Sequence, residues 1–401
     1  HYPLRRQRQM CIRDSFYTVF ARTDTPEGKV TAFIVEAGWE GVSHGPHEDK
    51  MGIRASSTTT VAFSDVRVPA ANVLGPVGKG FKVAMNILNS GRTGLGGGAV
   101  GGMRALIRMA CAQASERKQF GQSIAEFGLV REKIAQMTAD CFAAESTVWM
   151  VAHLIDSGRT DYSVEAAMSK IFASEAVQRS CYEALQIAAG NGFMRDLPYE
   201  QMTRDTRILS IFEGTNEILR LYVALNGLKG VGATLSELQS AVGGIFNDPI
   251  KGFGVLSDYA GRRVREATGY GTGRIRAPLN DALRPLARLC EKYTVELSKA
   301  SDRLLRKHGK KIADQQHAQK RVADIAIDLF VGLCVLSRVE SLLQAGHPAA
   351  DDAVKIARLF ARQARRRMAR NVRGLERNED EIVESLAASV LERGGYTWDV
   401  M

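Results

Sequence analysis

The spacing of apolar residues predicts two kinds of secondary structure along this chain of 401 residues. Short apolar runs that are rich in β-branched residues predict strands near the start of the chain. Four such runs occur before residue 75, at Phe16–Ala21, Lys29–Glu36, Thr58–Ser64 and Val66–Val68. Three or four short strands make an incomplete sheet, so residues 16–75 are interpreted as a partial β domain.

A helical period replaces the strands from Phe81 onward. It is clearest between residues 124 and 157, where apolar side chains recur every three or four positions. These side chains are Phe127, Val130, Ile134, Met137, Cys141, Ala144, Val148 and Val151. Helical spacing continues over Asp161–Ala189 and Glu217–Asn226, and it returns from 277 to 394. The chain is therefore predicted to be mainly α with a partial β domain.

Changes in pattern suggest where the segments of the chain begin and end. The pattern changes near Gly75-Pro76, and a glycine-rich break follows at Gly227–Gly232. Residues 1–15 are basic and polar and match nothing that follows, so we interpret them as a foreign or artefactual tail on a chain that begins inside a longer protein. The expected segments are the tail (1–15), the partial β domain (16–75), a helical domain (76–232), a linker or membrane-associated segment (233–276) and a second helical domain (277–401).

The composition is that of a globular protein with a basic surface. Hydrophobic residues make up 45% and charged residues 24%, which excludes wholesale disorder. The formal net charge of +10 suggests an anionic partner, and an arginine-rich helix at Lys355–Arg377 carries much of it. A solvated helix face is the favoured interpretation of that helix, with an anionic membrane as the alternative. It has no aromatic interleaving or nucleic-acid motif, so no nucleic-acid partner is expected.

Cysteine and histidine do not predict a metal site. No two of the six cysteines form a CxxC pair, so buried reduced thiols are expected. His44 and His47 could begin a metal site, but no third ligand pattern accompanies them. We predict that both are exposed residues of a polar loop.

Two glycine-containing motifs each have a structural explanation. Gly96–Gly101 spells the dinucleotide pattern GxGxxG, but a helical period precedes it where that motif needs a strand. Close packing of helices is therefore the favoured explanation. Arg117 and Phe120 offer a cation and an aromatic face to a phosphate-bearing ligand. Alternatively, they only mark the end of a long helix that Gly121 closes.

Glu213 is the strongest candidate for a catalytic group. It lies between Phe212 and Gly214 on a short apolar turn, and Thr215 is placed to cap the next helix. Poor solvation would raise the pKa of such a carboxyl group, as a general base acting on a weak carbon acid requires. A capping role, or a salt bridge to Arg204 or Arg207, explains the spacing equally well.

Five segments, taken in order, resemble the acyl-CoA dehydrogenase family. They are MGIRASSTTTVAFSDVRVPAANVLG, GKGFKVAMNILNSGR, ERKQFG, QIAAGNGF and RDTRILSIFEGTNEILR. The resemblance covers roughly residues 16–401. The region that contains GHPAA and ends with LERGGY resembles the very-long-chain branch, whose members form homodimers.

The resemblance implies a fold and an organisation. The family has an N-terminal helical domain, a middle β domain and a C-terminal four-helix domain. This chain would contain a fragment of the middle β domain, the four-helix-type domain and an extra C-terminal helical domain. The N-terminal helical domain and the first part of the β domain would be absent from it.

The resemblance also implies site residues. Glu213 would remove the α-proton of an acyl thioester while the β-hydrogen leaves as hydride to FAD, with Phe212 and Gly214 beside the thioester. Asn89, Ser90, Gly91 and Arg92 would hold the CoA portion. Thr215, Asn216 and Glu217 would lie along FAD. Arg117, Phe120, Gln186 and Gly190 would reach the FAD of the neighbouring subunit, although Ala189 replaces a glycine that is usual in relatives.

The implied activity is α,β-dehydrogenation of long or very long chain acyl-CoA to trans-2-enoyl-CoA in fatty acid β-oxidation. Electrons would pass to an electron-transfer flavoprotein, and a homodimer would retain the flavin. The expected location is cytoplasmic in a bacterium, with possible peripheral contact with the inner membrane, and mitochondrial in a eukaryote. The alternative is a non-catalytic assembly or interaction protein on the same fold.

Overall fold

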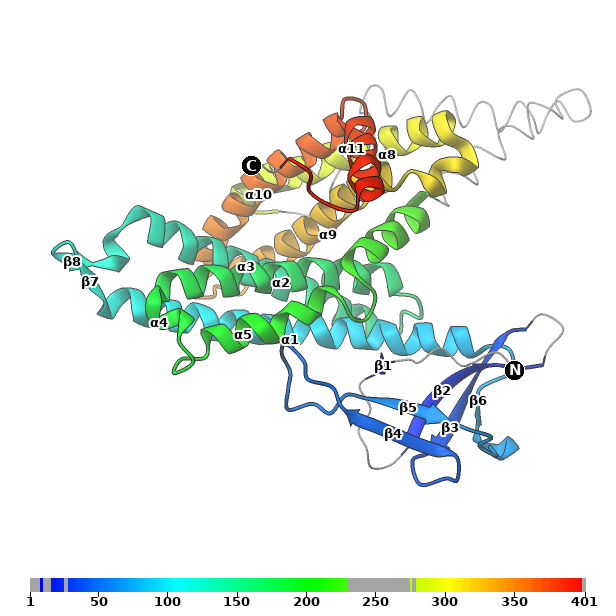
Figure 1. The fold of residues 1–401 in the computed structure, drawn as a ribbon. Helices are drawn as coiled ribbons and strands as arrows, with labels where there is room; N and C mark the ends of the chain where they lie inside the picture. The colour runs from blue at the N-terminus through cyan, green and yellow to red at the C-terminus, as the bar shows by residue number, and fades with distance from the viewer. Residues whose placement is uncertain (1–7, 10–15, 25–27, 229–274, 276–278, 399–401) are drawn as a thin grey trace, which may run out of the picture. The chain divides into compact units, whose positions relative to one another are not determined.

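The computed structural model describes residues 8–9, 16–24, 28–228, 275 and 279–398 (Figure 1). The chain divides into two compact units, which are described separately. Unit 1 comprises His1–Met137, Thr160–Ala166 and Ala173–Gly214, and unit 2 comprises Thr138–Arg159, Ala167–Phe172 and Thr215–Met401. The segment expected to be a linker, apart from residue 275, lies outside the described residues, as does most of the expected tail.

The strands of unit 1 form two small antiparallel sheets. One has the order β2 (Phe16–Arg22), β3 (Val30–Glu36), β6 (Val73–Leu74), and the other has the order β1 (Arg8–Gln9), β5 (Thr59–Phe63), β4 (Val42–His47). Three of the four predicted strands are confirmed as β2, β3 and β5. The prediction for Val66–Val68 is wrong, because pairing with β4 ends at Phe63 and the segment runs into Pro69, which has no N–H to donate.

Strand β4 was not predicted, because Gly45 and Pro46 make its sequence look like a turn. The register of its pairing with β5 shifts between His44 and His47, and this irregularity lets the strand accommodate Gly45 and Pro46. The histidines are therefore strand residues rather than loop residues. His44 Nε2 is hydrogen-bonded to the hydroxyl of Tyr17. Across the part of the chain that the structure describes, no group of three His, Cys, Asp or Glu side chains is arranged to hold a metal ion.

Helix α1 (Gly80–Glu116) starts against the first sheet and runs for 37 residues. A Cβ atom on Gly80 would lie 2.6 Å from the carbonyl carbon of Thr31 in β3, so only glycine permits this approach. Gly96–Gly101 lies inside the helix, which excludes a dinucleotide-binding turn there. The helical period is confirmed there, but the expected close packing of helices is not seen at Gly97, Gly98 and Gly101, where a Cβ atom would meet nothing within 4 Å.

A tight hairpin follows α1. Strands β7 (Lys118–Gln119) and β8 (Gln122–Ser123) pair across Phe120 and Gly121, whose φ angles are +53° and +81°. Two positive φ angles in a two-residue loop are typical of a type I′ turn. Gly121 therefore closes a hairpin, and the expectation that it ends the helix is wrong.

Longer helices then follow the predicted pattern. In chain order, the elements are the 3₁₀ turn η2 (Ile124–Glu126), α2 (Gly128–Asp156), α3 (Ser163–Ala188), α4 (Gly190–Phe193), α5 (Tyr199–Thr206) and the 3₁₀ turn η3 (Arg207–Ser210). Helices α2 and α3 contribute residues to both units. They confirm the helices predicted from residues 124–157 and Asp161–Ala189.

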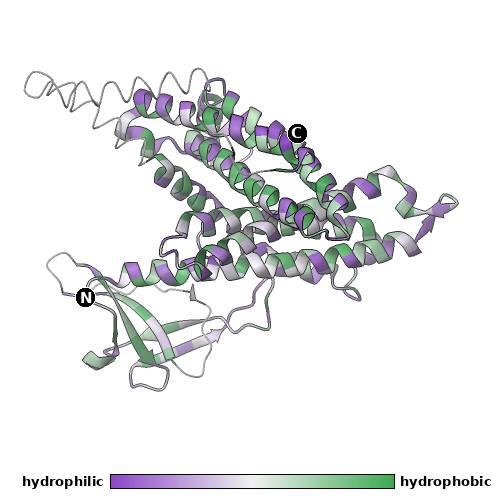
Figure 2. Ribbon diagram, turned by 180° about the vertical axis from the view of Figure 1, so that it is seen from behind, coloured by the Kyte–Doolittle hydropathy of each residue, from purple (hydrophilic) through white to green (hydrophobic). Residues whose placement is uncertain are grey.

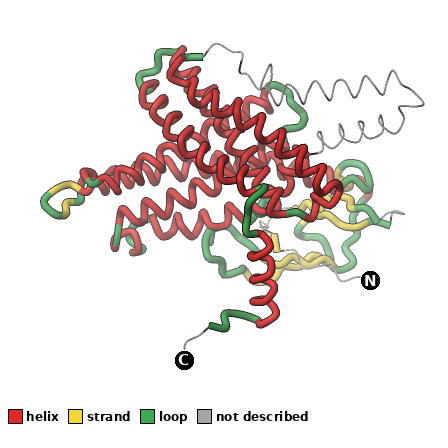
Figure 3. Tube along the Cα trace, turned by 90° about the horizontal axis from the view of Figure 1, so that it is seen from above, coloured by secondary structure: helices red, strands yellow, loops and turns green. Residues whose placement is uncertain are grey.

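Unit 2 is built on three long helices that pack together (Figures 1 and 3). They are α8 (Arg284–His308), α9 (Gln316–Gln344) and α10 (Ala350–Gly374), with α11 (Asp380–Arg393) after them. Green apolar and purple polar positions alternate along these helices (Figure 2). The apolar stripe on α9 is buried, as its spacing predicts. None of the described helices is long and apolar enough to cross a membrane.

The arginines of the basic run on α10 are not all exposed to solvent. Arg365 and Arg366 are exposed, as a solvated face requires. Arg367 instead turns toward α9, where its Nη2 donates to Asp328 Oδ1 at 2.6 Å and its guanidinium lies 5.6 Å from the centre of the Phe360 ring. One cation of the run is therefore part of an internal ion pair.

Most of the cysteines are buried free thiols, as expected. Cys141, Cys181, Cys290 and Cys334 are buried, whereas Cys111 is exposed on α1. Burial raises the pKa of the Cys290 and Cys334 thiols to about 12. These two thiols are therefore almost entirely protonated at neutral pH and chemically inert.

Candidate active site

Glu213 stands at the end of a chain of short helical turns in unit 1. Helix α5 continues directly into η3, and the amide of Phe212 donates to the carbonyl of Ile208 at 3.1 Å. Glu213 and Gly214 then both adopt positive φ angles, of +59° and +93°. A left-handed conformation is unfavourable for glutamate, and such strain concentrates at functional sites.

Helix α1 brings three of the predicted residues to Glu213. A Cβ atom on Gly91 would lie 2.8 Å from Glu213 Oε2 and 3.0 Å from Oε1, so the carboxyl group rests against the bare backbone of the helix. Arg92 Nε donates to the backbone carbonyl of Glu213 at 3.1 Å, and Arg92 Nη1 donates to Asn89 Oδ1 at 3.1 Å. Only 3% of Arg92 is exposed. Asn89, Gly91, Arg92 and Glu213 thus form one cluster.

Ser90 lies beside this cluster but faces a different partner. Its Oγ is 3.5 Å from the hydroxyl of Tyr162, at an exposed position. Ser90 is therefore accessible to a ligand, as the CoA-binding expectation requires.

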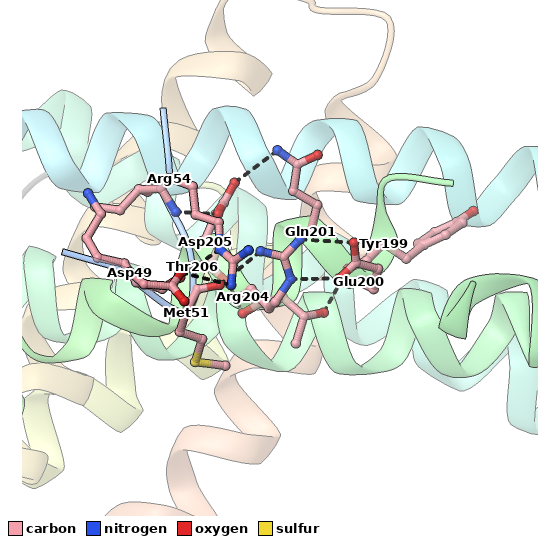
Figure 4. Close-up of polar contacts among 12 residues, drawn as sticks. Asp49, Met51, Arg54, Tyr199, Glu200, Gln201, Arg204, Asp205 and Thr206 are labelled. Carbon is pink, nitrogen blue, oxygen red and sulfur yellow. Dashed lines mark hydrogen bonds and ion pairs between the residues drawn. The ribbon is translucent and has the colours of Figure 1, made fainter. Parts of the chain in front are cut away.

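Arg204 does not serve as the counter-ion of Glu213. Its Nε and Nη2 donate to the two carboxyl oxygens of Glu200, at 2.7 and 3.0 Å (Figure 4). The hydrogen bond from Arg204 lowers the pKa of the Glu200 carboxyl group. A salt bridge between Glu213 and Arg204 is therefore not what holds the Glu213 turn.

The residues after Gly214 begin a helix over 216–228 in unit 2. The amide of Ile218 donates to Thr215 Oγ1 at 3.3 Å, which confirms Thr215 as the N-cap. Asn216 is only 2% exposed, and its Oδ1 accepts a hydrogen bond of 2.9 Å from Lys170 Nζ. Glu217 is exposed. The start of this helix is thus anchored by a buried polar pair.

Lys170 was missed by the sequence analysis. It lies on α3 and is 0% exposed, which is rare for lysine unless it is paired. The sequence does contain one indication that Lys170 is buried. Its neighbours Ala166, Ala167 and Ile171 are apolar core residues of the same helix. A lysine within an apolar helical pattern indicates a buried partner, although the pattern does not identify Asn216.

The four residues expected to reach a neighbouring flavin lie at the surface of unit 1. Phe120 is 94% exposed at the tip of the hairpin, in edge-to-face contact with Phe127. Arg117 is half-buried at the foot of the same hairpin, and Gln186 and Gly190 are exposed where α3 gives way to α4. They are accessible to a ligand.

Two family models match the chain along most of its helical part. "Acyl-CoA dehydrogenase, C-terminal domain" matches residues 78–228, and "ACAD9/ACADV, C-terminal domain" matches residues 281–396. The very long-chain specific acyl-CoA dehydrogenases of Bos taurus and Homo sapiens, both mitochondrial, are each 41% identical over 392 residues. The chain belongs to the acyl-CoA dehydrogenase family.

Solved acyl-CoA dehydrogenases agree with the fold. An acyl-CoA dehydrogenase from Bacillus anthracis, complexed with FAD, has a TM-score of 0.73 at 28% identity, covering 96% of this chain and 65% of that one. Butyryl-CoA dehydrogenase from Megasphaera elsdenii has a TM-score of 0.51 at 39% identity, covering 52% of this chain and 55% of that one. The Bos taurus and Homo sapiens alignments cover 94% of this chain and 59% of each relative's length. The mainly α fold with few strands is that of acyl-CoA dehydrogenases.

One residue of this acyl-CoA dehydrogenase chain adopts a conformation suited to glycine. Ala189 has φ +54° and ψ −133° at the junction of α3 and α4. This backbone region is costly for a residue with a Cβ atom. We expect Ala189→Gly to raise the free energy of unfolding by about 1 kcal/mol, because release of strain exceeds the added entropy of the unfolded chain.

Chemical denaturation of the parent and of the Ala189→Gly protein measures this difference in the free energy of unfolding. Gly190→Ala is the matched control, because a Cβ atom there would have nothing within 4 Å and the φ angle is not positive. If the Ala189→Gly protein is less stable than the parent, the backbone at Ala189 is not strained.

Proposed function

We propose that this chain carries the catalytic base of an FAD-dependent acyl-CoA dehydrogenase. The reaction is the α,β-dehydrogenation of a long or very long chain acyl-CoA to the trans-2-enoyl-CoA. The observation that carries the proposal is the cluster around Glu213, whose carboxyl group rests on Gly91 while Arg92 holds its backbone carbonyl. The similarity to very long-chain specific enzymes supports the choice of chain length.

Each residue of the cluster has a role in this chemistry. Glu213 removes the α-proton of the thioester, and desolvation by the bound acyl chain favours its action as a base. Its backbone N–H stabilises the charge that develops on the thioester carbonyl. Arg92 keeps the turn in place through the Glu213 carbonyl, while Asn89 orients Arg92. Phe212 and Gly214 flank the thioester, and Ser90 contributes to binding of the CoA portion.

Four surface residues of unit 1, of which Arg117 is half-buried, fit a flavin dinucleotide. Arg117 offers a cation for a phosphate, Phe120 an aromatic face and Gln186 an amide. A Cβ atom on Gly190 would meet nothing within 4 Å, which leaves room for a ligand to approach the backbone. In unit 2, Thr215, Asn216 and Glu217 begin a helix whose positive end suits an anionic group. FAD held by these residues would supply the acceptor for the β-hydrogen, which would leave the substrate as hydride.

The partners follow from the same assignment. An electron-transfer flavoprotein is the proposed electron acceptor, and the electron transferring flavoprotein structure from Acidaminococcus fermentans among the structural neighbours supports it. A homodimer would let Arg117, Phe120, Gln186 and Gly190 reach a neighbouring flavin. The location is mitochondrial in a eukaryote and cytoplasmic in a bacterium, where contact of the basic helices with an anionic membrane is the alternative to a solvated face.

Flavin reduction by substrate tests the proposal. A full-length version that contains this chain, reconstituted with FAD, is expected to be yellow and to bleach when palmitoyl-CoA is added without an electron acceptor. Absorbance near the flavin maximum measures the change, and free palmitate is the control because it has no thioester. A colourless protein in stable complex with other proteins would favour the assembly role instead.

A further inference from the structure

We infer that a loop of the β region and helix α5 form a latch that positions the Glu213 turn. The latch consists of Met51, Gly52 and Ile53 between β4 and β5, and of Arg204 and Asp205 at the end of α5. Figure 4 shows Met51, Arg204 and Asp205. The inference rests on the proposed role of Glu213 as the base. It assigns Arg204 and Asp205 as positioning residues.

The first contact of the latch is made by the Arg204 guanidinium. Its Nη1 donates to the carbonyl of Met51 at 2.9 Å, while its Nε and Nη2 hold both oxygens of Glu200. The planar group is therefore fixed from two sides, and the loop is joined to α5 through a charge-assisted hydrogen bond.

The second contact is made by the Asp205 carboxylate. Its Oδ1 accepts a hydrogen bond of 2.6 Å from the amide of Ile53, and its Oδ2 lies 3.4 Å from Gln201 Nε2. Ile53 has a φ angle of +44°, which is a strained conformation for a β-branched residue. A loop without this partner would relax, so the hydrogen bond selects a conformation that the loop sequence disfavours.

The third contact joins two backbones. A Cβ atom on Gly52 would lie 2.5 Å from the carbonyl oxygen of Arg204 and 2.8 Å from the Cα atom of Asp205. Any residue with a Cβ atom at position 52 would force one of the two backbones to move. Gly52 is therefore the most specific probe of the latch.

The latched helix leads to Glu213 without a flexible break. Helix α5 continues as η3, the amides of Ile211 and Phe212 both donate to the carbonyl of Ile208, and Gln178 Nε2 donates to Ser210 Oγ at 2.6 Å. A shift of the α5 backbone at Arg204 would therefore pass along η3 to the catalytic turn. A misplacement of about 1 Å at such a turn can cost on the order of 10²-fold in rate.

Gly52→Ala in the full chain tests the inference, with Gly38→Ala as the matched control because a Cβ atom there would meet nothing within 4 Å. We expect kcat for palmitoyl-CoA to fall about 10- to 100-fold in Gly52→Ala while KM changes less than about twofold. Hydrogen exchange at the amides of Phe212, Glu213 and Gly214 should accelerate in the same variant. The Gly38→Ala protein should match the parent in both measurements.

Asp205→Ala and Asp205→Asn provide a second test that does not depend on a backbone clash. Asparagine keeps an oxygen that can accept from Ile53, so Asp205→Asn should retain most of the activity that Asp205→Ala loses. Unchanged kcat and unchanged exchange at Glu213 in both Gly52→Ala and Asp205→Ala would overturn the latch. An inactive parent chain would refute the proposed function instead, and the exchange measurement would still decide on the latch.

Discussion

Replacing Glu213 with glutamine is expected to lower the turnover of palmitoyl-CoA by about 10²–10⁴-fold. Glutamine has nearly the same shape but cannot accept the α-proton, so the substitution removes the base and leaves the turn in place. Arg92 should still hold the backbone carbonyl at position 213, because that hydrogen bond does not involve the replaced carboxyl group. Binding of acyl-CoA should therefore be retained while dehydrogenation is lost.

Rapid-mixing absorbance of the FAD-loaded protein measures the loss directly. Glu132→Gln is the matched control, since Glu132 is an exposed carboxylate on α2 and the same atoms are changed. The control should reduce flavin at the rate of the parent. Parent-like turnover in Glu213→Gln would mean that another group is the base.

Gly91→Ala is expected to lower turnover by on the order of 10²-fold without loss of stability. The added Cβ atom would lie 2.8 Å from Glu213 Oε2 and 2.9 Å from its Cδ, so the carboxyl group must move away from α1. Alanine is at the same time the better helix former, by about 1 kcal/mol in a helix interior. Activity and stability should therefore change in opposite directions, which a general unfolding defect would not produce.

Gly94→Ala is the control for this prediction. Gly94 lies about one turn further along α1, and a Cβ atom there would meet nothing within 4 Å. The control should gain stability and keep its turnover. If Gly91→Ala also keeps parent-like kcat, the position of the Glu213 carboxyl group against α1 does not matter for the reaction.

Hydrophobic periodicity predicted the long helices and three of the described strands, β2, β3 and β5, because one buried face imposes its spacing on the sequence. It failed where local residue preference and tertiary pairing disagree. Strand β4 contains Gly45 and Pro46, which usually mark turns, yet it pairs with β5. The hairpin at Phe120-Gly121 was missed because its strands are only two residues long and carry no alternation.

The residues of the candidate site could be proposed from sequence, but their contacts could not. Arg92 was expected to bind CoA, and its hydrogen bond to the Glu213 carbonyl joins residues 121 positions apart. The spacing of residues predicts which of them are neighbours along one helix or strand. It does not predict contacts between residues that are far apart in the sequence. Lys170 shows the same limit, since only the folded chain brings it to Asn216.

The contact between Ile53 and Asp205 also has a consequence for biosynthesis. The two residues are 152 positions apart, so the acceptor for the Ile53 amide is synthesised long after the loop that contains it. At about 5–20 residues per second, the loop waits about 8–30 s for its partner to emerge from the ribosome. During that interval the strands around the loop lack the helix that fixes Ile53, and this nascent stage is when the β region most needs protection from aggregation.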